Sequence, residues 1–514
     1  MSKGPGKRVL FEQAASPALV FALTLLVFWP CLRFDFVRYD DLLLLQTPYR
    51  GLGWESIRWL FTHAQEGNYA PLPGLTYALD LALWGDAPFG YHLTNVLFHA
   101  ANAALFCLLA AEMLARGGAA TAKVRPAAFV SALLFSLHPL RIQSVAWIAE
   151  RRDVVCGAFV LLTLLCWVRG ASTEEAPARR WRAAALAAFV CALMSKATAL
   201  PLPAALLLID IWPLRQKHSW KRYAPFFLLS AVFAAFTLLE QSSSGALIDV
   251  AAAAPAARVK QALIGVVYYL GKALWPANLG LYEWHSWPPV RTATFLGATA
   301  TAALLWAAYL RASLRRPIFT ALLFQTLMLL PVLGLVTFGH EVVADRYSYL
   351  SGLGWALLAG AGLIGLSLKR RTASVMLACA TLAVLAATTR AQLPAWRNAE
   401  SLWRTVLRVD PKSLFARPNL ATALFDQGRD ADAFNYLEDQ VSVYPLDSES
   451  QEYLARRMKE TSTSAQDRSR HRLRLGREAA SREEHVLAAW HFQQALRLDP
   501  GNPDAAAGLE KARP

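Results

Sequence analysis

Residues 93–113, LTNVLFHAANAALFCLLAAEM, decide the fold class of this chain. The stretch holds one charged residue and has the length of roughly 17–25 residues that crosses a bilayer as a helix. Outward from it lie ten further apolar blocks, at about 14–31, 127–143, 154–168, 183–199, 200–214, 223–239, 294–310, 318–337, 348–368 and 372–390. The sequence therefore predicts an all-α, polytopic membrane protein with about eleven transmembrane helices.

The composition excludes most soluble classes of protein. Of 514 residues, 55% are hydrophobic and 17% are charged, whereas soluble domains carry about 25% charged residues. Lys and Arg number 52 against 37 Asp and Glu, but the excess lies in short loops between apolar blocks, so nucleic acid is not an expected partner. The six cysteines lie in or beside apolar blocks without metal-like spacing, and no metal site is predicted from them.

The charges of the loops predict the orientation in the membrane. The loops expected inside hold twenty basic residues against three acidic ones, whereas the first outside loop, 33–92, holds four basic and seven acidic residues. Because basic loops stay in the cytoplasm, the N-terminus is expected there and the C-terminus outside. The apolar stretch 262–276 fits only a re-entrant or surface helix. A bacterial inner membrane with a periplasmic C-terminus is the expected location, and an endoplasmic-reticulum membrane would show the same alternation.

The character of the chain changes at about residue 392, which divides a membrane domain, 1–391, from a second domain, 392–514. Pro411 and Pro445 are 34 residues apart, and each ends a helical pattern, as Pro500 does again. Small residues stand twelve positions before each proline: Ala399, Ala433 and Ala488. This spacing is typical of tetratricopeptide repeats, which stack into peptide-binding grooves. The charged stretch 446–480 is expected to be a degenerate copy or a loop.

The first outside loop contains two adjacent carboxylates, Asp40 and Asp41, just beyond a predicted span. Such a pair can raise one of its own pKa values and supply a general base. It can also bind a divalent cation through its oxygens. The alternative is an ordinary solvated acidic turn.

Ionisable and polar residues also gather at the outer ends of later predicted spans. They are His138, Arg141, Gln143, Glu150, Arg151, Arg152, Asp153, Lys196, Lys272, His285, His340, Glu341, Asp345 and Arg346. Charges at membrane depth are costly, so a functional site is the first hypothesis. A basic pocket facing an acidic loop suits a lipid that bears a phosphate. The alternative is a set of helix-end side chains and internal salt bridges.

Ordered motifs along the chain resemble a known family. They are YDD at 39–41, NYAPLPGLTYALDLALWG at 68–85, GYHLTNVLFHAANAALF at 90–106, LHPLRIQSVAWIAERRDVV at 137–155, MSKATALPLPAALLLIDIWPL at 194–214, GKALWPANLGLY at 271–282, ADRYSYL at 344–350 and WRNAESLWRTVL at 396–407. Their order resembles the transmembrane and tetratricopeptide-repeat O-mannosyltransferases and bacterial relatives, which are GT-C glycosyltransferases.

The resemblance implies an inverting transfer of a sugar from a polyprenyl-phosphate donor to a Ser or Thr hydroxyl. Mannose is the sugar expected. Asp40 or Asp41 matches the acidic pair that acts as base or orients the acceptor. The donor phosphate and sugar are expected at His138, Arg141, Arg151, Arg152, Lys196 and Arg346. Supporting roles are expected for Gln143, Glu150, Asp153, Lys272, His285, Asp345 and Tyr347.

The sequence departs from the family at two positions and leaves two other functions open. Relatives often carry Glu in place of Gln143 and His in place of Arg141. The first alternative is a glycosyltransferase that modifies a lipid-linked glycan, and the second is a non-catalytic membrane scaffold for envelope assembly. In the leading hypothesis, the repeats dock a protein or peptide acceptor.

Overall fold

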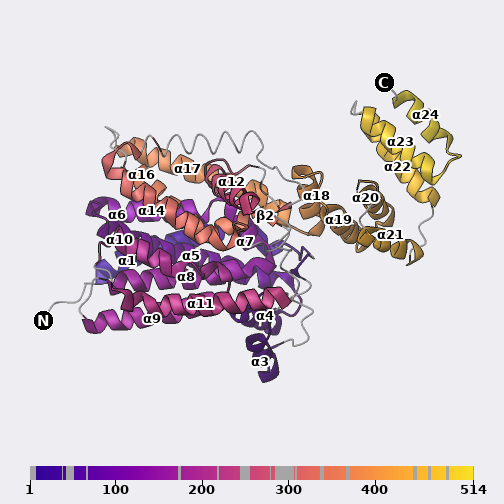
Figure 1. The fold of residues 1–514 in the computed structure, drawn as a ribbon. Coiled ribbons are helices and arrows are strands. Elements are labelled where there is room, and N and C mark those ends of the chain that lie inside the picture. Colours follow the sequence, from indigo (N-terminus) through magenta and orange to yellow (C-terminus); the bar gives the residue numbers. More distant parts are fainter. Residues whose placement is uncertain are drawn as a thin grey trace. The chain divides into compact units, whose positions relative to one another are not determined.

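The structure is a computed structural model that describes residues 7–37, 39–41, 51–64, 67–171, 175–216, 219–243, 255–277, 279, 281–283, 306, 309–335, 341–365, 371–443, 448–460, 465–481 and 485–512. In this part of the chain the fold is all-α apart from one small two-stranded sheet (Figure 1). The predicted fold class is confirmed.

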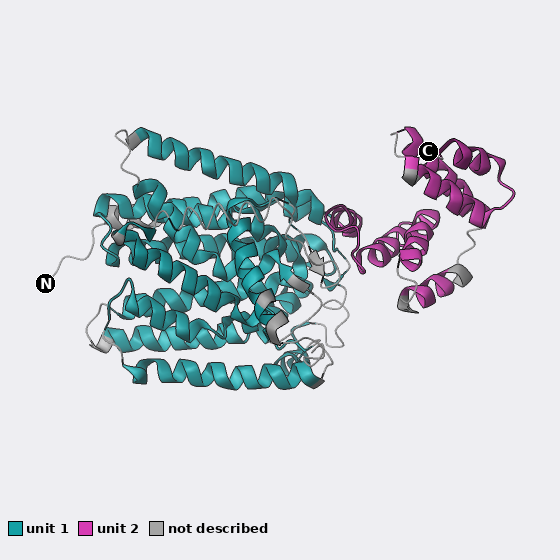
Figure 2. Ribbon diagram, turned by 45° about the horizontal axis from the view of Figure 1, so that its top comes forward, with its two compact units in different colours: residues 1–397 teal, residues 398–514 magenta. Residues whose placement is uncertain are grey.

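The chain forms two compact units, residues 1–397 and 398–514 (Figure 2). The sequence places this division at 391/392. The short helix η9 (Leu393–Trp396) accounts for the difference, because it packs into the first unit. Leu393 is fully buried, and the ring of Trp396 lies 5.7 Å from that of Trp147.

The first unit is a bundle of long helices (Figure 1). The helices of the bundle are α1 (Lys7–Phe28), α5 (Pro88–Arg116), α6 (Thr121–Ser136), α8 (Arg151–Gly170), α9 (Glu175–Leu193), α10 (Leu202–Ile211), α11 (Trp220–Ser243), α12 (Pro255–Leu274), α14 (Ala312–Leu329), α16 (Leu353–Gly365) and α17 (Arg371–Gln392). Two further helices, α3 (Trp54–Thr62) and α4 (Pro71–Trp84), lie at one end of the bundle.

Five helices among the described residues are long and apolar enough to cross a membrane, and seven if each of two bent pairs is one span. The five cover Ala15–Arg33, Pro88–Arg116, Ile148–Gly170, Trp220–Ser242 and Thr372–Trp396. The predicted span 294–310 falls almost wholly outside the described residues, so the count of eleven stays a prediction. The stretch 262–276 contains a shorter apolar helix, Gln261–Leu274.

The motif at 137–155 begins at the bend of one of these two helix pairs. Helix α6 ends at Ser136, and the chain resumes at η2 (Pro139–Arg141) and α7 (Ile142–Ala146) with a bend of 57°. Proline cannot donate the backbone hydrogen bond that would continue α6, so the helix ends before it. The chain then runs through η3 (Ile148–Glu150) into α8, which keeps residues 142–150 buried at one end of the bundle.

Close packing between α6 and α16 depends on a glycine. A Cβ atom at Gly360 would lie 2.2 Å from the Ser131 hydroxyl oxygen, which leaves no room for any other residue. Small residues at such contacts let membrane helices approach closely where burial from water gives no driving force.

The two strands lie beside the motif at 344–350. β1 (Leu281–Glu283) pairs antiparallel with β2 (Glu341–Ala344), with Leu281 opposite Ala344 and a register shift before Glu283. β2 continues directly into η8 (Asp345–Tyr347) and α15 (Ser348–Ser351). The sheet thereby fixes the position of the Arg346 backbone, two residues after β2 ends.

The second unit consists of consecutive packed helices. They are α18 (Ala399–Val409), α19 (Ala416–Phe425), α20 (Asp430–Val443), α21 (Ser448–Glu460), α22 (Ala465–Ser481), α23 (His485–Leu498) and α24 (Pro503–Ala512). Ala399, Ala433 and Ala488 are all buried, as the repeat pattern requires of small residues at helix crossings. The stretch 446–480 is not a loop, since α21 and most of α22 occupy it. The assignment to tetratricopeptide repeats stays a prediction.

Candidate active site

The acidic pair lies in the segment that follows α1 and η1 (Trp29–Arg33). Asp41 is 1% exposed, and its two carboxylate oxygens accept hydrogen bonds from the Val37 and Ala149 amides, at 2.9 and 3.0 Å. Asp40 is only half-buried. Asp41 therefore ties the acidic segment to the residue before Glu150, and Asp40 is the more accessible carboxylate.

Burial changes the proton affinity of Asp41, which lies outside the membrane-spanning segments. Desolvation raises the pKa of Asp41 from 3.8 to about 7, the two backbone hydrogen bonds oppose this, and the neighbouring charge of Asp40 adds to it. Asp41 can thus hold a proton near neutral pH. Both of its oxygens also accept hydrogen bonds from backbone amides.

Trp147 joins the acidic segment to later parts of the chain. Its ring lies 5.9 Å from Tyr39 and 5.7 Å from Trp396, and the Arg346 guanidinium lies 5.4 Å from its centre. An aromatic face attracts a guanidinium at this distance. The Asp35 amide also donates to the Arg397 carbonyl, at 2.9 Å. Residues 393–397 therefore contact both the acidic segment and Trp147.

Glu150 lies at the centre of three cations. Its Oε1 is 3.1 Å from Arg346 Nε and 3.3 Å from an Arg152 nitrogen, and its Oε2 is 2.7 Å from Lys196 Nζ. Lys196 also pairs with Asp153, at 2.9 Å. We call Glu150, Arg152, Asp153, Lys196 and Arg346 the cation cluster. Three positive and two negative groups leave it with one net positive charge.

Within the cation cluster, the positively charged side chains are more exposed than the carboxylates. The side chains of Arg152, Lys196 and Arg346 are 23%, 14% and 11% exposed, whereas those of Glu150 and Asp153 are almost fully buried. Asp40 interacts electrostatically with Arg152. The cluster can therefore present positive charge to a ligand beside the acidic pair.

Three neighbouring residues hold Arg346 in place. The Arg346 amide donates to the side-chain oxygen of Gln143, at 2.9 Å, and the Tyr347 ring lies 5.0 Å from the Arg346 guanidinium. Asp345 is buried and accepts a hydrogen bond from Tyr268. An amide oxygen at position 143 makes the contact that a glutamate oxygen would make there, so Gln143 can orient this backbone.

Two of the predicted donor-binding arginines lie in other surroundings. Arg141 is buried and donates to the carbonyl and hydroxyl oxygens of Ser348, at 2.8 and 2.7 Å. Arg151 is completely buried, pairs with Asp80 and donates to Asn95 at 2.7 Å. Both guanidinium groups are thus paired inside the bundle. In this geometry they stabilise the packing around the site and do not face a ligand.

Among the described residues, His138 and Lys272 contact α12 and the residues that follow it, not the cation cluster. His138 Nε2 lies 3.1 Å from the Ala273 carbonyl, while its Nδ1 accepts from the Leu140 amide. Lys272 donates to the Ala277 carbonyl and lies 5.2 Å from the Tyr268 ring. His285 and His340 fall outside the described residues.

A divalent cation at the acidic pair has little support in this geometry. Both Asp41 oxygens already accept backbone hydrogen bonds. Among the described residues, no group of three or more His, Cys, Asp or Glu side chains could hold a metal ion. A cation that needs six or more oxygen ligands would find one accessible carboxylate, that of Asp40.

Trp147, Trp396 and Asp80 also belong to the site and its support, and none of them was expected there from the sequence. Trp147 and Trp396 are inside the quoted motifs, so the motifs themselves were the available signal. Asp80 is a lone acidic residue in the apolar stretch at 71–84, and the cost of burying an unpaired charge was the signal that it needed a partner.

Taken together, the apolar helices and the enclosed polar site define a multi-pass membrane protein. Protein O-mannosyl-transferase TMTC2 of Mus musculus is 35% identical to this chain over 171 residues, 31% of this chain and 19% of the relative. Protein O-mannosyl-transferase TMTC1 of Homo sapiens is 24% identical over 519 residues, 84% of this chain and 55% of the relative. The resemblance seen in the motifs is therefore confirmed, although the chain spans about a fifth and about half of these relatives.

Solved structures give a weaker similarity, and no family model matches the chain. ArnT from Cupriavidus metallidurans bound to undecaprenyl phosphate has a TM-score of 0.39 and 16% identity, over 83% of this chain and 76% of that one. The apo form of ArnT gives 0.40 and 17% over the same shares.

Proposed function

We propose that the chain is a membrane glycosyltransferase that transfers a sugar, mannose, from a polyprenyl phosphate to Ser or Thr hydroxyls of exported proteins. The observation that carries the proposal is the hydrogen bond between Asp41 and the Ala149 amide. It fixes an acidic segment one residue from Glu150, around which three cations from different elements converge. The relatedness to protein O-mannosyl-transferases supports the substrate class.

The donor phosphate binds at Arg152, Lys196 and Arg346. Arginine and lysine are the side chains that bind phosphate through charge-assisted hydrogen bonds. The Glu150 carboxylate already pairs with all three cations. The phosphate shares these cations with Glu150, and their stabilisation of the leaving phosphate's charge lowers the barrier.

Asp40 is the general base. It takes the proton of the acceptor hydroxyl while that oxygen attacks the sugar, and the phosphate leaves on the opposite face, which inverts the anomeric carbon. Asp41 positions this segment, since both its oxygens bind backbone amides. The base and the phosphate-binding cations come from different elements, as inversion requires.

The location and the acceptor complete the proposal. The cation cluster lies at the outer side of a bacterial inner membrane, with the N-terminus in the cytoplasm and residues 398–514 in the periplasm. The second unit docks protein acceptors as a stack of tetratricopeptide repeats.

The test is sugar transfer by the purified full-length protein in nanodiscs, with polyprenyl-phosphate mannose as donor and a Ser/Thr-rich exported protein as acceptor. Asp40→Asn should lower transfer by about 10²–10⁴-fold, the usual contribution of a general base. Arg346→Ala should weaken donor binding as well as transfer. Arg180→Ala, at an exposed position of α9, is the matched control and should change neither.

Three results decide against the proposal. Transfer to a lipid-linked glycan but not to protein would assign the first alternative. Absence of donor binding, together with loss of envelope complexes on deletion, would assign the scaffold. Full activity of Asp40→Asn would remove Asp40 as the base.

A further inference from the structure

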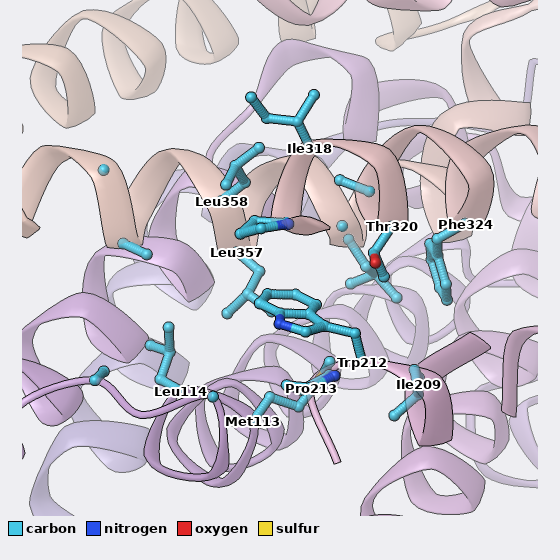
Figure 3. Close-up of a pocket in the computed structure, with 18 of the residues that line it drawn as sticks. Met113, Leu114, Ile209, Trp212, Pro213, Ile318, Thr320, Phe324, Leu357 and Leu358 are labelled. Carbon is cyan, nitrogen blue, oxygen red and sulfur yellow. The ribbon is translucent and has the colours of Figure 1, made fainter. Parts of the chain in front are cut away.

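A cavity of about 680 Å³ lies between α5, α8, α10, α14 and α16 (Figure 3). Its walls are mostly apolar, with Met113, Trp212, Leu357 and Leu358 among the side chains that converge on it (Figure 3). Arg311 is the charged side chain among the described residues that line it. An apolar chain with one anionic group would match these walls.

The cavity lies away from the candidate active site. Helix α8 starts beside Glu150 in the cation cluster and reaches the cavity only at Leu164. Helix α5 lines it with its last turns, including Met113, and α16 lines it as far as Gly365. These ends carry the basic loops that the sequence predicts to be cytoplasmic. The cavity therefore belongs to the opposite leaflet from the proposed donor site.

Glycines leave space in the wall of the cavity. A Cβ atom at Gly362 or Gly365 would meet no atom within 4 Å, whereas one at Gly360 on the same helix would collide with Ser131. Both Gly362 and Gly365 are exposed, so the cavity is open on this side of α16. Apolar cavities hold water poorly, because a buried water needs polar partners. An apolar ligand fits this space better than solvent does.

The charges beside the cavity favour an anionic headgroup. Arg311 precedes the first turn of α14, which contains Arg315 and no acidic residue, and Arg316 follows directly. Helix N-termini carry partial positive charge, so cations gathered there are unfavourable unless an anion is near. No ion pair to Arg311 is found in the described part of the chain, and Arg311 is exposed.

We propose that this cavity binds one acyl chain of an anionic phospholipid, whose phosphate lies at Arg311. Because the cavity lies at the opposite end of α8 from the proposed donor site, a bulk phospholipid is a better match than the polyprenyl phosphate of the proposed reaction. The inference does not depend on that reaction.

The test uses the full-length protein, delipidated in detergent and titrated with phosphatidylglycerol or phosphatidylcholine of identical chains, with bound lipid counted by native mass spectrometry. Wild type should bind one phosphatidylglycerol more tightly than phosphatidylcholine. Arg311→Gln should weaken phosphatidylglycerol binding by about fivefold, the effect of one basic side chain near an anionic surface. Arg316→Gln removes the same charge from an exposed position that does not line the cavity, and should have a smaller effect.

A second variant tests the cavity itself. Gly362→Leu should fill it, weaken binding of both lipids and raise the unfolding temperature of the lipid-free protein. Ala359→Leu adds apolar bulk at an exposed residue of α16 that does not line the cavity, and should leave lipid binding unchanged. Equal binding of the two lipids, or unchanged binding in Gly362→Leu, would overturn the proposal. Displacement of phosphatidylglycerol by polyprenyl phosphate at equal concentration would assign the cavity to the polyprenyl chain instead.

Discussion

Asp41→Asn should remove a large part of the pH dependence of stability. Asp41 is buried, and its pKa is raised from 3.8 to about 7, chiefly because burial disfavours the charged carboxylate. The folded protein therefore holds a proton that the unfolded chain releases between about pH 4 and pH 7. The stabilisation is fully present below pH 4 and is lost as the pH rises through 7.

The magnitude follows from the size of this shift. One pKa unit corresponds to about 1.4 kcal/mol, so a shift of about 3 units corresponds to about 4 kcal/mol. Between pH 5 and pH 8 the wild type should lose about 3 kcal/mol of this contribution. Asparagine has the same shape, carries no charge and loses one hydrogen-bond acceptor, at a cost of about 1–3 kcal/mol that does not vary with pH.

The assay is thermal unfolding of wild type and Asp41→Asn in the same detergent at pH 5 and pH 8. The variant should be less stable than wild type at pH 5 and as stable or more stable at pH 8. Asp40→Asn is the control: its charge contributes only a minor part of the Asp41 shift, so pH dependence should shrink slightly and persist. Parallel pH profiles for wild type and Asp41→Asn would refute the reasoning.

Three further changes test separate parts of the molecule. Asp80→Ala leaves the fully buried Arg151 without its carboxylate and should cost about 3–5 kcal/mol in the unfolding of the first unit, measured by denaturation. Glu150→Gln removes the carboxylate that shares the three cations, and binding of polyprenyl phosphate, measured by titration, should tighten about tenfold, a change of about 1.4 kcal/mol. Gly476→Val places a Cβ atom 2.6 Å from the Phe492 ring and should cost about 1–3 kcal/mol in the second unit, while the calorimetric transition of the first unit stays in place.

Much of the helical organisation could be predicted from the sequence. The apolar stretch 93–113 lies inside α5, and the block 154–168 lies inside α8. Long apolar runs predict helices reliably because a backbone in lipid must satisfy its own hydrogen bonds. The boundary of the second unit was harder to predict from the sequence. Helix η9 belongs to the first unit only because of tertiary contacts such as that of Trp396 with Trp147.

The sequence also predicted that ionisable residues would gather at one end, but not how they pair. Arg151 and Arg152 are adjacent, and both were expected at the donor. Successive residues of a helix point about 100° apart. Arg151 therefore meets Asp80 inside the bundle, whereas Arg152 meets Glu150 at the surface of the site.

By itself, the sequence determined that the chain is a helical membrane protein, since the length of an apolar run acts locally along the chain; the outer position of the acidic segment stays a prediction. Tertiary structure alone decided which groups share a site. Asp41 meets Ala149 across 108 positions, and Arg346 meets Glu150 across a still longer separation. Contacts of this kind depend on how helices pack and turn, and no local pattern of residues encodes them.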